Sequence, residues 1–224
     1  LGWSGPAESV HFDPNGIQAC LRQVDRPVYL VRQNGMIGAT HDGALSPSSS
    51  TDSTDVLALV RAFAAQDFGS REFRTAHGVD LACTAGAMAN GIASEDLVIA
   101  MGRQNMLASF GAAGLVPARI EQAIKTIKSQ LPNGPYAFNL IHSPSEAELE
   151  RGAVQLYLKH NITTVEASAF LRLTPSVVRY RVAGLSTDPQ GNIATKNRII
   201  AKVSRREVAK QFLAPAPTRV LKQL

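Results

Sequence analysis

The sequence predicts an α/β protein whose larger part is built from parallel β/α units. From Leu81 onward, short apolar stretches alternate with amphipathic stretches, which is the pattern of strands joined by covering helices. The amphipathic stretches open with residues that cap helices. We count five such units in the 224 residues, of which 45% are hydrophobic, so a sizeable core can form. Five units fit an open doubly wound sheet or most of a (β/α)₈ barrel, and periodicity does not decide between them.

The N-terminal region is predicted to be a small β-containing appendage. Residues 28–31 are rich in β-forming side chains, and Asn34-Gly35 follows them. This pair favours the positive φ angles of a tight turn, so we expect a hairpin.

A boundary between two domains is predicted near residue 50. The stretch SPSSSTDST, residues 46–54, is too polar and too rich in Ser and Pro for a core, which indicates a loop or linker. The domains are therefore expected at 1–50 and 51–224. A helix that covers the sheet is expected next, because the following apolar residues are spaced as one helical stripe: Val56, Leu59, Val60 and Phe63.

The first two β/α units are predicted from LACTAGA and MLASFGAAG. The helix after the first is expected to start at Ser94, with Glu95 and Asp96 complementing its positive end. The helix after the second is expected from Pro117, with an apolar stripe formed by Ile120, Ala123, Ile124, Ile127 and Leu131.

The remaining three units begin with YAFNLI, ITTVEASAF and RIIAKV. Residues 143–146 and 204–207 have the sequence of capping boxes, and Thr174-Pro175 reads as an N-cap followed by a first-turn proline. Between the fourth and fifth units, the strong turn at residues 188–192 predicts a hairpin-like excursion.

Composition excludes several classes of protein. The net charge of +5 is a mild basic excess without a long basic run, and no nucleic-acid-binding motif is present. No apolar run is long enough for a membrane helix. The two cysteines, Cys20 and Cys83, suit a reducing cytoplasm, with Cys83 in the core. The five histidines include no metal-spaced pair, so no metal site is expected.

Function is expected where strands lead into loops, because ligands gather at the carboxyl ends of parallel strands. Glycines, an amide, a hydroxyl and a lysine there would suit a planar, polar heterocycle. In chain order the candidates are Met88, Ala89, Asn90 and Gly91; Gly111 to Gly114; Asn139 and His142; Glu166 and Ser168; and Lys202 and Ser204.

Several of these residues also have a purely structural interpretation. Gly111 could relieve crowding at a turn, and Met88 could fill the core. Glu166 and Lys202 could simply pair with each other at the rim. Asn139 favours ligand contact, since a buried amide needs several partners. Lys202 could hold a phosphate, stabilise an anionic reduced cofactor or form a Schiff base.

Five long segments resemble the PfaD family: AGAMANGIASEDLVIAMGR, FGAAGL, GPYAFNLIHSP, VEASAFLRLTPSVVRYR and NRIIAKVSRREVA. This family comprises flavin-dependent enoyl reductases of polyunsaturated fatty acid synthases and trans-acyltransferase polyketide synthases, within the nitronate monooxygenase-like group. The similarity runs from about Phe73 to Pro217. It implies an FMN-binding (β/α)₈ barrel, of which about five units are present here.

The resemblance also implies roles for particular residues. Ala87, Met88 and Ala89 would lie along the isoalloxazine ring, Asn139 would bond its polar edge, and Lys202 would place positive charge near the pyrimidine portion. NADPH would reduce FMN, which would pass hydride to the β-carbon of a trans-2-enoyl thioester. The predicted cofactor-binding set is completed by strand-end residues: Asn90, Gly111, Glu166 and Ser168.

Related enoyl reductases carry a Gly-Gly-His segment beyond the fifth strand and hold the flavin phosphate after strands seven and eight. The proton-donor histidine is therefore expected beyond residue 224, and the catalytic residue is left unassigned. We expect the chain to be part of a longer polypeptide or to be completed by another chain.

The resemblance implies an acyl carrier protein as substrate donor, alongside other synthase subunits, with a homodimer left open. An acidic carrier would dock on basic residues late in the chain: Arg172, Arg179, Arg181, Lys196, Arg198, Arg205 and Arg206. Three alternatives are kept: a nitronate monooxygenase, a non-catalytic scaffold within a megasynthase, and a lysine-dependent aldolase.

Overall fold

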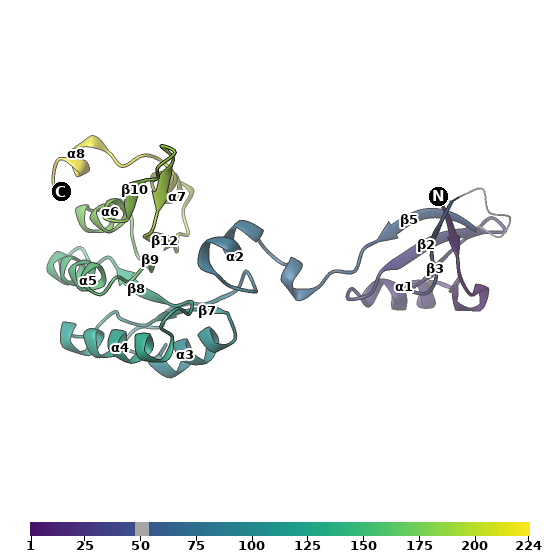
Figure 1. Cartoon of the computed structure of the whole chain (residues 1–224), viewed down its shortest axis with the longest axis horizontal. Coiled ribbons are helices and arrows are strands. Elements are labelled where there is room, and N and C mark those ends of the chain that lie inside the picture. Colours follow the sequence, from purple (N-terminus) through teal and green to yellow (C-terminus); the bar gives the residue numbers. More distant parts are fainter. Residues whose placement is uncertain (48–53) are drawn as a thin grey trace. The chain divides into compact units, whose positions relative to one another are not determined.

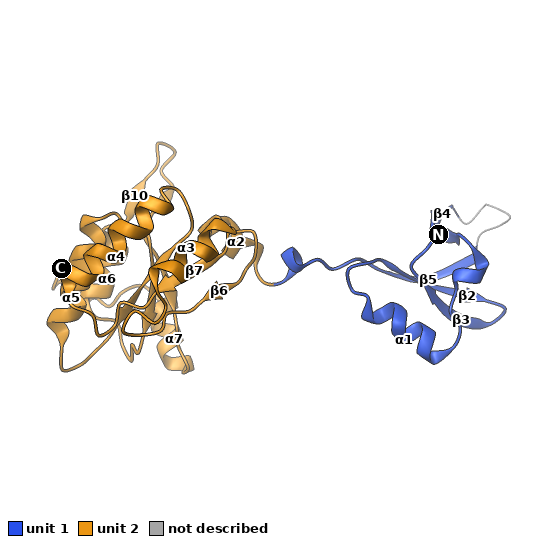
Figure 2. Ribbon diagram, turned by 90° about the horizontal axis from the view of Figure 1, so that it is seen from below, with its two compact units in different colours: residues 1–68 blue, residues 69–224 orange. Residues whose placement is uncertain are grey.

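The chain divides into two compact units, Leu1–Phe68 and Gly69–Leu224 (Figure 2). The computed structural model describes residues 1–47 and 54–224, so most of the predicted Ser/Pro linker, residues 46–54, lies outside the described residues. The division after Phe68 comes later than the boundary expected after residue 50.

The first unit is an antiparallel sheet with a short helix. Its sheet has the strand order β3-β2-β5-β1-β4. The predicted hairpin is confirmed, because β2 and β3 pair and the turn residues Asn34 and Gly35 have φ angles of 51° and 79°. Its elements are β1 (Gly2–Ser4), α1 (Pro14–Arg22), β2 (Val28–Gln33), β3 (Met36–Thr40), β4 (Ala44–Ser46) and β5 (Thr54–Val60), with 3₁₀ turns at Ala7–Ser9 and Ala65–Asp67.

The helix expected around residues 56–63 is wrong, because Thr54–Val60 forms strand β5. This strand pairs with β1 and β2 and so belongs to the first unit. Val56 packs against the buried cluster of Trp3, Val10 and Val31. A short apolar run fits the helical and the strand period alike, and here two neighbouring strands supply its backbone hydrogen bonds. This pairing also explains why the unit extends past residue 50.

The second unit contains five parallel strands in the order β12-β9-β8-β7-β6, of which Figure 1 labels β12, β9, β8 and β7. Strands that follow one another along this order also follow one another in the sequence, with only a hairpin inserted before β12. The order never reverses, as it would in a doubly wound sheet. The sheet is a curled parallel half-barrel. Its elements are α2 (Arg71–His77), β6 (Thr84–Ala85), α3 (Glu95–Arg103), β7 (Leu107–Phe110), α4 (Pro117–Gln130), β8 (Ala137–Ile141), α5 (Ala147–Lys159), β9 (Thr164–Ser168), α6 (Pro175–Val182), β10 (Leu185–Thr187), β11 (Ile193–Thr195), β12 (Arg198–Ala201), α7 (Arg206–Leu213) and α8 (Thr218–Leu221).

The covering helices form one layer, since α3 contacts α4, α4 contacts α5 and α5 contacts α6. The main core lies between this layer and the sheet and includes the aromatic side chains of Phe110, Phe138, Tyr157 and Tyr180. Among the described residues, no helix is long and apolar enough to cross a membrane.

The helix starts predicted at Ser94, Pro117 and Thr174 are confirmed, whereas the two predicted capping boxes are wrong. The hydroxyls of Ser94 and Thr174 accept hydrogen bonds from the backbone of the first turns of α3 and α6. In contrast, α5 and α7 start without a side-chain cap, after residues 143–146 and within 204–207. Ser143 instead donates to the carboxylate of Glu146 at 3.3 Å, so the two side chains satisfy each other rather than the helix backbone.

The structure also tests the predicted excursion before the fifth strand and the predicted burial of Cys83. The excursion before the fifth strand is confirmed as the antiparallel pair β10–β11, whose turn is held by the carboxylate of Asp188. Cys83, expected in the core, is exposed because the strand around it is reduced to Thr84–Ala85.

Candidate functional site

The predicted site residues lie on the concave face of the half-barrel. Val165 and Ala167 of β9 pack under the helices, so the alternating residues Glu166 and Ser168 face the other side of the sheet. The same alternation on β8 places Asn139 on that concave face.

The carboxylate of Glu166 joins three strands across this face. Its Oε1 lies 2.9 Å from the Nζ of Lys202, which directly follows β12. The backbone N–H of Ala87, after β6, donates to both of its oxygens at 3.3 and 3.2 Å. Since β6 and β9 are not neighbours in the sheet, this contact spans the curl. The Glu166 side chain is only 2% exposed, so the ion pair compensates a charge that water does not reach.

The ammonium group of Lys202 is bound by Glu166, yet more than half of the Lys202 side chain is exposed to solvent. Its side chain is 56% exposed although its ammonium group contacts a buried carboxylate. Gly86 leaves space beside the pair, because a Cβ there would lie 3.6 Å from Glu166 Oε2 and 3.8 Å from Lys202 Nζ. The ammonium group therefore has protons left for a ligand on the concave face.

The amide of Asn139 is oriented by its neighbours. Its Nδ2 donates to the backbone carbonyl of Glu166 at 3.1 Å and to the hydroxyl of Ser168 at 3.0 Å. Both amide protons are thus used, and no described residue donates to its Oδ1. Asn139 can therefore accept a hydrogen bond from a ligand but has no proton left to give.

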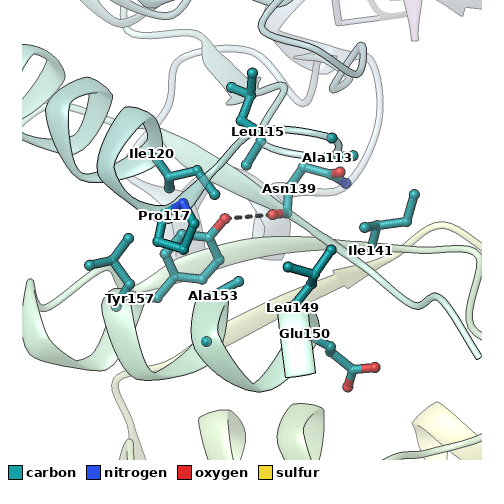
Figure 3. Close-up of a pocket in the computed structure, with 14 residues that line it drawn as sticks. Ala113, Leu115, Pro117, Ile120, Asn139, Ile141, Leu149, Glu150, Ala153 and Tyr157 are labelled. Carbon is teal, nitrogen blue, oxygen red and sulfur yellow. Dashed lines mark hydrogen bonds between the residues drawn. The ribbon is translucent and has the colours of Figure 1, made fainter. Parts of the chain in front are cut away.

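Tyr157 of α5 supports this strand from below. Its hydroxyl donates to the backbone carbonyl of Asn139 at 2.6 Å (Figure 3). Burial raises the pKa of Tyr157, so the hydroxyl stays a donor. Sequence reasoning missed this residue, although Glu150, Val154 and Tyr157 follow the spacing of a buried helical stripe.

The cavity beneath Asn139 is too small to be a cofactor site. It lies between α4, α5 and β8, is lined by residues such as Ile120, Ala153 and Tyr157, and has a volume of about 50 Å³ (Figure 3). That space holds a few water molecules, whereas sites for drug-sized ligands are about 300–1,000 Å³. The cavity beneath Asn139 is therefore too small for a planar heterocycle.

The loop after β6 is held to the loop after β7 by backbone hydrogen bonds. The amides of Asn90 and Gly91 donate to the carbonyls of Ala113 and Gly111 at 2.8 and 2.9 Å. A Cβ on Gly111 would lie 1.7 Å from the carbonyl oxygen of Met88, so close backbone approach requires glycine there. Met88 is 45% exposed and is not a core filler.

Asn90 and Gly91 both have positive φ angles, 57° and 72°, which turn this loop sharply. Ala89 and Asn90 are exposed on it. The loop therefore presents its backbone beside the Glu166–Lys202 pair, to which Ala87 directly connects it.

A second polar group lies beyond the carboxyl end of β8. His142 Nδ1 is 2.8 Å from the Oε2 of Glu150, and Thr174 donates its hydroxyl to the other oxygen of that carboxylate. The His142 ring stacks on Phe170 at a centroid distance of 5.3 Å. His142, predicted as a candidate, thus points towards α5 and α6 and not into the group around Asn139.

The basic residues expected to form one docking surface lie at two ends of the sheet. Strands and following helices run in opposite directions, so residues after a strand lie at its carboxyl end and the last turn of a helix lies near the amino ends. Arg172, Arg205 and Arg206 belong to the carboxyl end; Arg179, Arg181, Lys196 and Arg198 belong to the amino end. Among the described residues, no cluster of His, Cys, Asp and Glu is arranged to hold a metal ion.

Comparison with known proteins gives consistent relatives. Residues 3–62 match the family described as "Fatty acid synthase subunit PfaD N-terminal domain". The chain is 44% identical over 223 residues to a polyunsaturated fatty acid synthase subunit of Thraustochytrium sp., covering 99% of this chain and 14% of that protein. It is 41% identical over 161 residues to polyketide biosynthesis protein PksE of Bacillus subtilis, covering 71% of this chain and 21% of the relative.

A solved structure is similar in fold. The enoyl reductase domain of MlnA, from the macrolactin biosynthesis cluster of Bacillus amyloliquefaciens, matches with a TM-score of 0.69 and 38% identity. The match covers 71% of this chain and 37% of that structure. The chain thus spans only a minor part of each of these relatives.

Proposed function

Since the chain belongs to the PfaD family of polyunsaturated fatty acid and polyketide synthase proteins, we propose that it is part of an FMN-dependent, NADPH-using enoyl reductase. The substrate is a trans-2-enoyl thioester carried by an acyl carrier protein. The solved enoyl reductase domain of MlnA supports the reaction class. The observation that carries the proposal is Lys202, held by a buried carboxylate yet open on the concave face.

The residues on the concave face fit a flavin ring. Gly86 leaves room beside the ion pair, and the loop carrying Ala87, Met88 and Ala89 offers its backbone next to it. The Oδ1 of Asn139 can accept from a ring N–H. FMN, when bound, would supply hydride transfer from NADPH to the β-carbon of the enoyl thioester.

Lys202 would balance negative charge at the pyrimidine edge of the ring. A fixed cation stabilises such charge strongly where water is excluded. Glu166 keeps the ammonium group in place, and Ser168 keeps the Asn139 amide turned so that its oxygen is free. Asn90 and Gly111 shape the loop that the ring would lie against.

The second unit would then be the first part of an FMN-binding (β/α)₈ barrel, acting in the cytoplasm with other synthase subunits. As the family resemblance implies, we expect the proton donor from outside residues 1–224. A homodimer is a separate prediction, which a measurement of the protein's mass in solution tests.

The test is an absorbance spectrum of the full-length protein, followed by anaerobic addition of NADPH. We expect flavin bands that bleach with NADPH and return with an enoyl thioester. Lys202→Met should weaken FMN binding or slow this cycle by about 10- to 100-fold, the loss expected when one hydrogen bond to a charged group is removed. Lys196→Met is the matched control, because the ammonium group of Lys196 donates to the Asn161 side chain and not to a carboxylate.

Other results would select other functions. A flavin that turns over with nitronates and oxygen, without NADPH, would identify a nitronate monooxygenase. A protein that binds no FMN would be a scaffold. Borohydride trapping of a carbonyl substrate on Lys202 would identify the aldolase.

A further inference from the structure

A second cleft opens at the same end of the half-barrel, beyond the carboxyl ends of β8 and β9. Its volume is about 480 Å³, and it lies between the starts of α5 and α6 and the segment around α8. It is separate from the concave face, because His142 points into this region and away from Asn139. The cleft and the concave face adjoin at the ends of β8 and β9, where the His142 amide donates to the Ser168 carbonyl at 3.0 Å.

The walls of the cleft are fixed by one buried carboxylate. Glu150 is 4% exposed and holds both His142, after β8, and Thr174, the N-cap of α6. On the third side, Val220 of α8 is buried in the main core. The three segments that line the cleft are therefore anchored.

The charges that line the cleft include two arginines without an acidic partner among the described residues. Glu150 is occupied by His142 and Thr174, and Glu148 is paired with Arg151. Arg172 and Arg219 also line the cleft, and neither forms a salt bridge with any described residue. The helices α5 and α6 start at this cleft, and their positive ends add to the potential. The cleft is therefore suited to an anion.

We propose that Arg172 and Arg219 bind the phosphate of the arm that carries the thioester. This inference rests on the proposed function, in which the substrate arrives on a carrier protein through a phosphopantetheine arm. That arm has one fixed anionic group, its phosphodiester. With the phosphate in the cleft, the arm runs over the strand ends at Ser168 towards Lys202. Guanidinium groups bind phosphate with charge-assisted, often bidentate hydrogen bonds.

The experiment is calorimetric titration of the full-length protein with 4′-phosphopantetheine and with pantetheine, which lacks the phosphate. We expect phosphopantetheine to bind at least about tenfold more tightly. The double variant Arg172→Gln/Arg219→Gln should remove this preference and leave the affinity for pantetheine unchanged. Arg179→Gln removes an exposed arginine of the same α6 segment that does not line the cleft, and should preserve the preference.

Two results would overturn the proposal. Equal affinity for the two compounds in the unchanged protein would show that the phosphate is not recognised. Inorganic phosphate binding as tightly as phosphopantetheine would show a general phosphate site that does not select the arm.

A kinetic arm separates this inference from the proposed function. In an active reductase, the double variant should raise the KM for carrier-bound enoyl thioester by about tenfold and spare a phosphate-free N-acetylcysteamine thioester. If the double variant reduces both thioesters with unchanged KM values, the proposed phosphate site is refuted and the enoyl reductase proposal stands. If the protein prefers phosphopantetheine to pantetheine but binds no flavin, the enoyl reductase proposal is refuted and the phosphate site stands.

Discussion

Removing the Lys202 ammonium group should destabilise the second unit more than removing the charge of its partner. In Lys202→Met the carboxylate of Glu166, 2% exposed, keeps the Ala87 amide as its one donor among the described residues. In Glu166→Gln the amide oxygen can still accept from Ala87, and the freed lysine is already half in water. The two halves of the pair are therefore unequal.

The expected magnitude follows from this asymmetry. Breaking a fully buried pair costs about 3–5 kcal/mol, whereas an exposed pair contributes about 0–1 kcal/mol. Because Lys202 is 56% exposed, we expect a loss of about 2 kcal/mol for Lys202→Met. Glu166→Gln should cost about 0.5 kcal/mol, and the double variant about the same, which gives a coupling energy of about 2 kcal/mol.

Urea unfolding of the four proteins measures this cycle, with two signals. The chain has one tryptophan, Trp3, which is buried in the first unit, so its fluorescence reports that unit. Far-UV circular dichroism is dominated by the helices of the second unit. The loss should appear in the dichroism and leave the fluorescence transition unchanged. Equal costs for both single variants, with coupling below about 0.5 kcal/mol, would refute the reasoning.

Three further predictions concern other contacts. Gly111→Ala should lower the free energy of unfolding by about 3 kcal/mol or more, because the new Cβ would overlap the carbonyl oxygen of Met88. Gly86→Ala should leave the free energy of unfolding nearly unchanged, because its Cβ would meet its neighbours at ordinary contact distances. Similar urea midpoints for the two variants would contradict this prediction. Tyr157→Phe should cost about 1–2 kcal/mol by leaving a buried carbonyl without its donor, and an unchanged midpoint would show that water replaces the hydroxyl. Hydrogen bonds from a lysine and a histidine at the end of α5 lower the pKa of Glu121 to about 2, so its stabilising contribution is present above its ordinary value of 4.5 and is lost as the pH falls towards 2. The stability difference between the unchanged protein and Glu121→Gln should therefore shrink over that range in acid titrations, and a constant difference would refute the bridge.

The sequence specified the features that depend on a few adjacent residues. The hairpin at Asn34-Gly35 and the caps at Ser94 and Thr174 are set by local φ preference and by side chains that reach their own backbone. The strand ends carrying Asn139 and Glu166 were also predictable, because an amide and a carboxylate interrupt apolar runs there. The apparent capping boxes failed because a local motif can be satisfied in more than one way.

The tertiary structure decided every feature that depends on distant partners. Residues 54–60 form a strand because β1 and β2 lie on either side of them, which no local period reveals. The sequential strand order, the contact of Ala87 with Glu166 across the curl, and the separation of the basic residues into two ends arise from the path of the sheet. The sequence by itself therefore determined the order of units and the residue types at their ends, whereas only packing of the sheet decided which of those residues meet.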